Sequence, residues 1–223
     1  MSQPIPPLAV DWNNLFNLAT FIAVTAMAIV VGAMVYFSVK YRQRKGQPRF
    51  VVEETLARTR ARDAVVFASI SIIILFSLSV AQYRLTPNAR FPPSVSKSLV
   101  IDVTAFQWSF KFVYPNGVNT TGEFNVPANS NIVFNVTSSD VMHTFGLPDF
   151  RVKIDAIPGR YNIIGITTPS LNGNSELNYT VRCYELCGVG HTYMVAQMKV
   201  MDPVAFNQWL NSQKPEKATG SGG

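Results

Sequence analysis

The sequence predicts two membrane-spanning helices followed by an outer domain made mostly of β-strands. Two long uncharged runs in the first part of the chain predict the helices. Short apolar runs separated by Pro, Gly, Asn and Ser predict the strands. Of the 223 residues, 48% are hydrophobic and 14% are charged, and this balance excludes an intrinsically disordered chain.

The first predicted element is a helical hairpin. Neither Trp12–Val39 nor Ala64–Tyr83 contains a charged residue. Each run reaches the length of about 20 residues that a helix needs to cross a bilayer. We therefore predict helices over about 13–39 and 64–83. The alternatives are two buried core helices, which are rare in so small a domain, and a cleaved signal peptide, which would need Lys or Arg in residues 1–11.

The distribution of charge predicts the orientation of this N-terminal region, 1–84. The formal net charge is +6, and the segment 40–62 alone holds eight basic and two acidic residues. Because Lys and Arg accumulate on cytoplasmic loops, the loop 40–63 is predicted to be cytoplasmic. Both termini and the outer domain then lie on the outer side of a plasma or inner membrane, in contact with a lipid bilayer. The outer domain is nearly neutral, which excludes a basic nucleic-acid-binding face.

The outer domain, 85–210, is predicted to be a β-sandwich or barrel. Aromatic residues occupy alternate positions from Phe106 to Tyr114, a period of two that is typical of a half-buried strand. The residues Pro115-Asn116-Gly117 follow and predict a turn. Further short runs rich in β-branched residues predict strands at Leu99–Thr104, Ile132–Thr137, Tyr161–Thr167, Leu177–Cys183 and Val195–Met201.

The end of the chain is predicted to be a short helix and a polar tail. Asp202 and Pro203 suit the N-cap and the first position of a helix that runs through Leu210. Residues 211–223 end in Gly-Ser-Gly-Gly and are predicted to be flexible. Three Asn-x-Ser/Thr sequences are glycan acceptors in any source that modifies such sites: Asn119, Asn135 and Asn178.

The side chains that carry chemistry are concentrated in the segment Cys-Tyr-Glu-Leu-Cys-Gly-Val-Gly-His-Thr-Tyr-Met. Its metal-binding side chains are Cys183, Cys187, His191 and Met194. Gly188 and Gly190 disfavour a helix, so we predict a loop after a strand. The second histidine of the chain, His143, lies 40 residues before Cys183, at the end of a predicted strand. A β-sandwich could bring it beside the loop.

This set of side chains favours copper. Copper prefers thiolate, thioether and imidazole ligands, whereas Ca²⁺ and Mg²⁺ take oxygen ligands. The number of ligands suggests more than one metal ion. Spacing alone leaves other interpretations open. A Cys183–Cys187 disulfide suits an oxidising compartment, a Cys₂His₂ zinc site has no use for the methionine, and a mononuclear blue-copper site needs one cysteine only.

The segment Cys183–Met194 closely resembles the copper-binding loop of cytochrome c oxidase subunit II. The resemblance extends to the helical hairpin, to Asp140-Val-Met-His143, to Asp155-Ala-Ile-Pro-Gly-Arg160 and to the strand around Gln107-Trp108. It implies an all-β cupredoxin-like sandwich of Greek-key topology, preceded by the transmembrane hairpin. It also implies the electron-transfer subunit of a proton-translocating heme–copper terminal oxidase, in which heme binding and oxygen reduction belong to subunit I.

Position by position, the resemblance implies a binuclear copper centre, called CuA. In the family, two thiolates bridge two copper ions, and two imidazoles, a thioether and a backbone carbonyl complete the ligands. The matching residues here are Cys183 and Cys187, His143 and His191, Met194, and Glu185. The side chain of Glu185 also matches a residue directed at a magnesium ion shared with subunit I. Trp108 matches the aromatic residue at which electrons enter, although its period-two strand favours an inward-facing core position.

The sequence departs from many relatives on the donor side. Phe106 and Phe110 stand where these relatives have a histidine and a tryptophan. Relatives that accept electrons from basic cytochrome c present an acidic face, whereas Ala64 to Gly223 contains nine acidic residues and eleven basic ones. Electrostatic steering of a cationic donor is therefore expected to be weak.

We expect instead a membrane-bound or small outer redox protein, such as a copper protein, that docks through apolar contacts. Cytochrome c is the alternative donor. The candidates for polar docking contacts are Gln107, Asp140 and Asp149.

The predicted partners in the membrane are subunit I and the other oxidase subunits. Asp155 and Arg160 are the candidates for contacts with subunit I, and an exposed turn is the alternative for this pair. A different functional class is a membrane-anchored copper chaperone for oxidase assembly, which also has two cysteines four residues apart and a distal histidine. In that family the histidine follows the cysteines in a thioredoxin-like fold. Nitrous oxide reductase needs more histidines, and quinol oxidase relatives lack the copper ligands.

Overall fold

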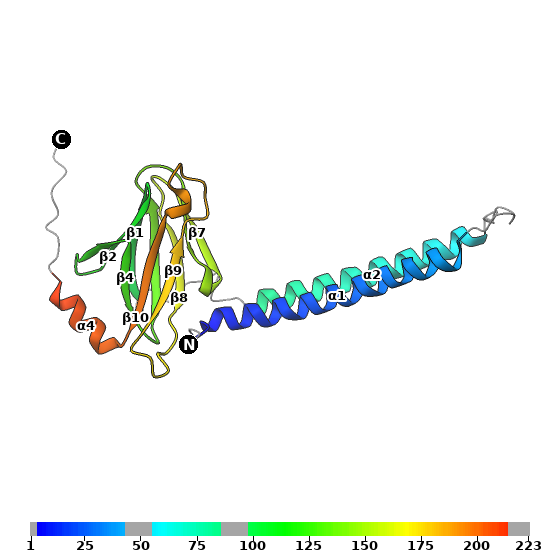
Figure 1. Cartoon of the computed structure of the whole chain (residues 1–223), viewed down its shortest axis with the longest axis horizontal. Helices are drawn as coiled ribbons and strands as arrows, with labels where there is room; N and C mark the ends of the chain where they lie inside the picture. Colours follow the sequence, from blue (N-terminus) through cyan, green and yellow to red (C-terminus); the bar gives the residue numbers. More distant parts are fainter. Residues whose placement is uncertain (1–3, 43–54, 86–97, 214–223) are drawn as a thin grey trace. The chain divides into compact units, whose positions relative to one another are not determined.

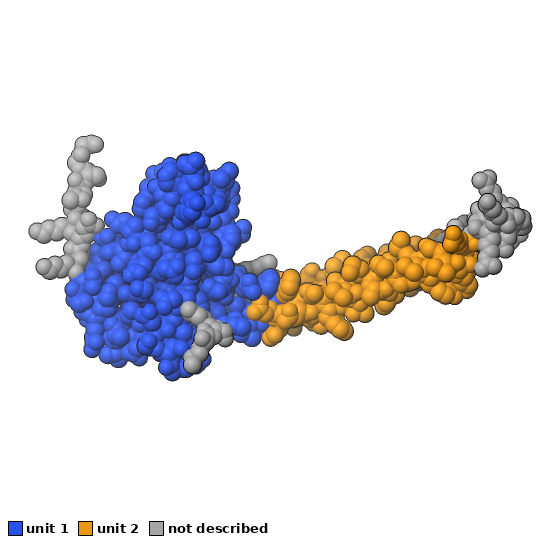
Figure 2. Space-filling view, in the orientation of Figure 1, with its two compact units in different colours: residues 1–12, 86–223 blue, residues 13–85 orange. Residues whose placement is uncertain are grey.

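The computed structural model of the chain describes residues 4–42, 55–85 and 98–213 (Figure 1). It divides into two compact units (Figure 2). One unit, Asn13–Leu85, is helical, and the other combines Met1–Trp12 with Thr86–Gly223 and contains the strands. The division falls after Leu85, whereas the sequence prediction placed it after residue 84, and the first twelve residues group with the β-domain and not with the hairpin.

The hairpin consists of α1, Pro7–Lys40, and α2, Thr55–Leu85. Both helices are longer than predicted. Their segments Ala9–Lys40 and Ala61–Arg84 have mean hydropathies of 2.4 and 2.6 and are long and apolar enough to span a membrane. Because α2 begins at Thr55, the predicted loop 40–63 is wrong in its second part, and residues 43–54 lie outside the described residues. Charge ends an apolar run but not a helix, since Arg and Lys are good helix formers.

Several hydroxyl side chains of the two helices form hydrogen bonds within their own helix. Five hydroxyl groups donate to the carbonyl oxygen four residues earlier at 2.8 to 2.9 Å: those of Thr25, Ser69, Ser71, Ser77 and Ser79. A bilayer core offers no water to such groups, so internal hydrogen bonds suit a membrane-spanning helix.

The start of the chain contacts the β-domain through residues that include Pro4 and Trp12. The Tyr179 hydroxyl donates to the carbonyl oxygen of Pro4 at 2.8 Å. The Arg151 guanidinium lies 4.8 Å from the centre of the Trp12 ring, a cation–π distance. These contacts explain why the first twelve residues group with the strands.

The β-domain is a sandwich of two five-stranded sheets, as predicted. The first sheet has the strand order β3 (Asn119–Thr121), β2 (Ser109–Val113), β1 (Leu99–Phe106), β5 (Asn131–Ser138) and β8 (Asn162–Thr167). The second has the order β4 (Glu123–Pro127), β10 (Val195–Met201), β9 (Glu176–Arg182), β6 (His143–Leu147) and β7 (Val152–Ala156). The pairs β1–β5 and β4–β10 are parallel, and the other named pairs are antiparallel.

Aromatic side chains fill the space between the sheets. Phe112 of β2 stacks on Phe124 of β4, with ring centroids 3.9 Å apart. Phe134 of β5 contacts both Phe124 and Phe145 of β6 at 5.8 and 5.0 Å. Full burial of such a side chain stabilises a fold by about 1.5–3 kcal/mol, so these rings account for much of the adhesion between the sheets.

The prediction of one strand from Phe106 to Tyr114 is wrong. The chain turns at Gln107 and Trp108, and β1 pairs antiparallel with β2 through Phe106 and Ser109. Phe110, Phe112 and Tyr114 face the core as expected, whereas Trp108 is exposed. The remaining five predicted strands are all present, within one or two residues of their predicted bounds.

The C-terminal helix agrees with its prediction. It is α4, Pro203–Ser212, and the Asp202 carboxylate accepts hydrogen bonds from the backbone N–H groups of Val204 and Ala205. Phe206 is buried, and Trp209 packs edge-on against Tyr114 with centroids 5.3 Å apart. Residues 214–223, most of the predicted tail, lie outside the described residues.

Candidate metal centre

The candidate ligands come from two segments that the second sheet brings together. His143 is the first residue of β6, and Cys183 follows directly after the last residue of β9. These strands pair, with Gly146 opposite Arg182. Between Cys183 and β10 the chain forms a loop, which the Cys183 N–H closes by donating to the Met194 carbonyl at 3.2 Å. The loop is not helical except for one short 3₁₀ turn at His191–Tyr193, as its glycines predicted.

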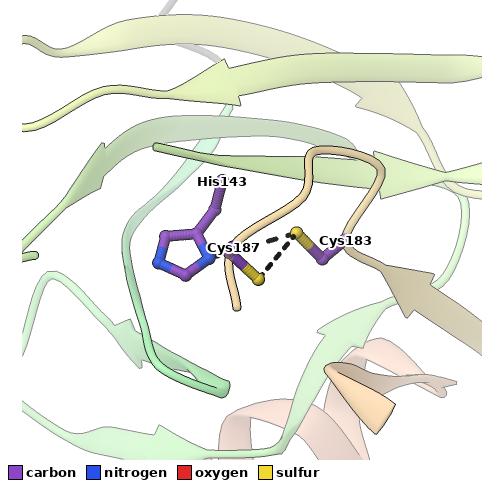
Figure 3. Close-up of side chains that lie close together, drawn as sticks. All are labelled: His143, Cys183 and Cys187. Atoms are coloured by element: carbon purple, nitrogen blue, oxygen red, sulfur yellow. Dashed lines mark hydrogen bonds between the residues drawn. The ribbon is translucent and has the colours of Figure 1, made fainter. Parts of the chain in front are cut away.

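Three buried ligand atoms form the middle of the site (Figure 3). The two cysteine sulfurs are 3.8 Å apart, and the Cys183 sulfur lies 4.0 Å from Nδ1 of His143. All three ligand atoms lie within 4.8 Å of one another. Among the described residues, these three side chains are the cluster of His, Cys, Asp or Glu that could hold a metal ion. Both cysteines are free thiols, not a disulfide.

Three further donor atoms surround the sulfurs. Nδ1 of His191 and Sδ of Met194 lie 3.6 and 3.7 Å from the Cys187 sulfur. The backbone oxygen of Glu185 lies 3.2 Å from the Cys183 sulfur. The geometry therefore brings together all six donors that the resemblance implied. Two sulfurs, two imidazoles, a thioether and a carbonyl suit copper ions, and they are more ligands than one tetrahedral zinc ion takes.

A carboxylate fixes the orientation of His143. Its Nε2 lies 2.8 Å from Oδ1 of Asp140, and its ring is fully buried. Because Nε2 pairs with the carboxylate, Nδ1 is left free to bind a metal. Burial raises the pKa of Asp140, but hydrogen bonds from His143, Gln107 and Val141 outweigh it, so the pKa lies below its ordinary value.

The thiol of Cys187 holds its proton strongly before metal arrives. Burial, followed by the nearby Cys183, raises the pKa of Cys187 to about 11. Since metals bind the thiolate, an incoming ion must displace this proton.

The β1–β2 turn lies against the ligand loop. Nε1 of Trp108 donates to the Cys187 carbonyl at 3.3 Å. A Cβ atom on Gly190 would lie only 2.4 Å from Cδ2 of this indole, so the ring rests directly on the loop backbone. Trp108 is still 40% exposed. The inward-facing core position that was the alternative for Trp108 is therefore wrong.

The other predicted site residues are spread over the domain. Gln107 and Asp140 lie beside the ligands, whereas Asp149 lies away from them in the 3₁₀ turn Pro148–Phe150. Asp155, on β7, accepts a hydrogen bond from the Thr144 hydroxyl at 3.0 Å, one residue after His143. Arg160 is exposed and closes a turn with Ile157.

Exposed apolar side chains on the two ligand segments were not recognised from the sequence. We call them the apolar rim, and they are Val141, Met142, Leu186, Val189 and Tyr193, with exposed fractions from 40% to 92%. Their position in the sequence could have revealed that they are exposed. They flank ligands in turn-rich segments, where no strand or helix could bury them.

Comparisons with known proteins match this chain to subunit II of terminal oxidases. A family model described as the periplasmic domain of cytochrome c oxidase subunit II matches residues 116–201. The heme-copper oxidase subunit 2 of Aeropyrum pernix is 36% identical over 220 residues, which cover 92% of this chain and 91% of that protein. The probable cytochrome c oxidase subunit 2 of Rickettsia bellii is 25% identical over 240 residues, covering 97% and 84%.

A solved structure supports the same fold. The periplasmic domain of subunit II of cytochrome oxidase (CoxB) from Bradyrhizobium japonicum superimposes with a TM-score of 0.50 at 31% identity. The match covers 55% of this chain and 96% of that one. The β-domain of this chain is therefore a cupredoxin-like sandwich.

Proposed function

This chain belongs to the cytochrome c oxidase subunit II family of heme–copper oxidases, and we propose from this membership that it is the electron-transfer subunit of its complex. In this proposal two copper ions occupy the metal centre. Electrons arrive from an external donor and pass to the heme of subunit I, where oxygen is reduced to water in a proton-translocating enzyme. A thiolate-bridged copper pair would supply a redox centre that shares each electron between two metals and so changes its bond lengths little.

The observation that carries the proposal is the convergence of six donor atoms around two sulfurs 3.8 Å apart. Each sulfur has donors of its own: Nδ1 of His143 and the Glu185 carbonyl lie near Cys183, and Nδ1 of His191 and Sδ of Met194 lie near Cys187. These six donors would suffice to hold two ions, with the thiolates of Cys183 and Cys187 shared and the other four donors as terminal ligands. One zinc ion or one blue-copper ion would leave donors unused.

Trp108 is the proposed entry point for electrons. Its indole is partly exposed, rests on Gly190 and donates to the carbonyl of the ligand Cys187. A donor that touches this ring is separated from the Cys187 backbone by one side chain. This contact, rather than the aromatic periodicity, supports the assignment.

We propose that the donor docks mainly through apolar contacts with the apolar rim. Val189 is 92% exposed and Tyr193 is 83% exposed, although both stand in the ligand loop. Of the proposed polar docking residues, Asp140 already accepts hydrogen bonds from His143 and Gln107, which reduces its capacity to bind a partner. A small copper protein fits this surface better than a strongly basic cytochrome c.

The donor proposal is tested by salt dependence and by one pair of variants in the purified oxidase. Val189→Asp is expected to raise the KM for the donor, whereas Val204→Asp, on the exposed surface of α4, is expected to leave it unchanged. Fast turnover with a basic cytochrome c that falls steeply with added salt would contradict apolar docking.

On the side of subunit I, the proposed contacts are Asp155, Arg160 and Glu185. Asp155 is held by Thr144 on the same strand as His143, which links this surface to the metal centre. The carboxylate of Glu185 is the proposed ligand of a magnesium ion shared between the two subunits.

We further propose that both termini and the β-domain lie on the outer side of the membrane.

The copper assignment is tested on the purified protein after copper loading. We expect two copper ions per chain, a purple colour and a seven-line EPR spectrum from an electron shared by two equivalent coppers. A colourless protein with one zinc ion, or a four-line spectrum from one copper, would contradict the assignment of a two-copper centre. Cys187→Ser should abolish the shared spectrum, because a hydroxyl replaces one of the two sulfurs.

A further inference from the structure

The β1–β2 turn stands between the two segments that carry the metal ligands. Strand β1 runs parallel to β5, with Ala105 opposite Ser138, and the Ser139 N–H donates to the Ala105 carbonyl at 3.0 Å. The chain leaves β5 toward His143 at the same place where β1 turns into β2. Gln107, the first residue of the turn, therefore lies beside the His143 segment.

Gln107 makes hydrogen bonds to both ligand segments. Its backbone N–H donates to Oδ2 of Asp140 at 2.7 Å, and its side-chain Nε2 donates to the Cys187 carbonyl at 2.7 Å. The other carboxylate oxygen of Asp140 pairs with Nε2 of His143 at 2.8 Å. A continuous chain of short hydrogen bonds thus runs from the backbone of one thiolate ligand to the ring of one imidazole ligand.

We propose that Gln107 is a positioning residue of the metal centre, which holds the Cys187 loop and the His143 ring at a fixed separation through its two hydrogen bonds. The inference rests on the proposed copper function, since it concerns the same ligands. From the sequence, Gln107 was a candidate for a polar docking contact with the donor. Its amide is directed at the metal loop instead.

The loop is shaped to receive this side chain. Gly188 has φ +116°, and a Cβ atom there would lie 3.0 Å from Nε2 of Gln107, so a larger residue would crowd the amide. The Cys187 carbonyl also accepts from Trp108, and two donors thereby fix its direction. Holding the exposed Gln107 side chain in one rotamer costs conformational entropy. The hydrogen bond to the Cys187 carbonyl offsets this cost.

Fixing these two segments matters because their ligands are far apart in sequence. His143 reaches the site from β6, and Cys187 belongs to a loop whose own closure involves Met194 and not His143. The hydrogen-bond chain through Gln107 and Asp140 joins them independently of any metal. Partners of metal ligands outside the ligand set typically change metal affinity by about 10–100-fold when they are removed.

The test is copper binding by Gln107→Met and Gln107→Lys in the full chain, by competition with a chelator and by EPR. Gln107→Met keeps the backbone N–H but has no side-chain donor. We expect its copper affinity to fall about 10–100-fold, with loss of the seven-line spectrum from part of the sample. Gln107→Lys retains a donor and should largely restore both properties. Gln197→Met changes an exposed glutamine on β10 whose side-chain amide donates to the Thr180 hydroxyl at 3.5 Å, and it should behave like the unaltered chain.

The outcomes separate the inference from the proposed function. If the unaltered chain does not bind two copper ions, the proposed function fails. If it does, and Gln107→Met binds copper with the same affinity and spectrum, the positioning role is overturned even if the melting temperature falls. Should Gln107→Met not fold, Gln107→Glu replaces it, because a carboxylate of the same shape cannot donate; normal copper binding by that variant would equally overturn the role.

Discussion

Single residues determine how closely the β1–β2 turn approaches the metal loop. Gly190 has no side chain, and the atoms Cδ2 and Cγ of Trp108 would lie 2.4 and 2.5 Å from a Cβ atom at this position. Real Cβ contacts are not that short, so any larger residue must displace the indole. In the proposed function, the access of electrons to the centre would therefore depend on the absence of a side chain at Gly190 as well as on Trp108.

Gly190→Ala is expected to push the Trp108 ring away from the loop and slow reduction of the centre by its donor, with copper binding retained. Overpacking of this kind also destabilises a fold by about 1–3 kcal/mol. Stopped-flow reduction measures the first effect and denaturant unfolding the second. In a Trp108→Ala background the substitution should have no further effect on the reduction rate; equal slowing in both backgrounds would contradict the explanation.

The candidate metal ligands could be identified from the sequence because their side chains are chemically rare. Two cysteines, His191 and Met194 fall within one short segment, and the chain has only two histidines. The roles of Gln107 and Asp140 could not be predicted in the same way. Both are common polar residues in turns, and a sequence does not show whether such a side chain is directed at solvent or at a neighbouring loop.

At the scale of elements, alternation predicted most strands but concealed one turn. Inward-facing residues are at odd positions in β1, Ile101 and Val103, and at even positions in β2, Phe110 and Phe112. This change of parity marks the two-residue turn. The half-buried Phe106 and the exposed Trp108 hid it, because they extended the even-numbered pattern backward through the turn.

Strand β6 escaped prediction for a different physical reason. All five of its residues, His143–Leu147, are buried, including the polar His143 and Thr144, so polarity along the strand does not follow an alternation of inward and outward positions. Its neighbour β7 is an edge strand with a mixed pattern. The location of the second metal segment in the fold thus depended on tertiary packing that local sequence does not encode.

Strand β9 is coupled to the start of the chain by Tyr179, and this contact should make stability depend on alkaline pH. Burial, followed by the charge of Asp149, raises the pKa of Tyr179 to about 12. The neutral phenol is therefore favoured in the folded state, and its contribution is present below about pH 10 and lost as the pH rises toward 12.

Tyr179→Phe is expected to lower the free energy of unfolding at neutral pH by about 0.5–1.5 kcal/mol, because the hydrogen bond to Pro4 is lost. The same variant should lose less stability than the unaltered chain between about pH 10 and pH 12. Urea unfolding at pH 8 and at pH 11 measures both effects. Parallel pH profiles for the two proteins would show that Tyr179 does not contribute.

At the scale of the whole molecule, charge and apolar surface divide the chain into regions with different surroundings. The described parts of α1 and α2 include two segments apolar enough to span a membrane, and the positive surplus lies between them in 40–62. The β-domain buries a cluster of phenylalanine side chains and is nearly neutral. The sequence predicted this division well, since composition is a property of long segments and does not depend on exact side-chain contacts.

Protease added to right-side-out membrane vesicles is expected to digest the β-domain and to spare the basic segment 40–62. The reason is that basic residues remain on the cytoplasmic side. Immunoblots against the two regions measure the result, and inside-out vesicles should give the opposite pattern. A β-domain that is protected in right-side-out vesicles would reverse the topology.

The parallel pairing of β4 with β10 also has a consequence for the order in which the protein matures. It joins Glu123 to Gln197, and the metal centre similarly joins His143 to Cys183, so the contacts that matter most are remote along the chain. Contacts of this kind form slowly during folding. Until they form, the two thiols are not held together with their imidazole neighbours, and copper delivered at that stage would meet an incomplete site. In the proposed function, copper insertion is therefore expected to follow folding of the β-domain.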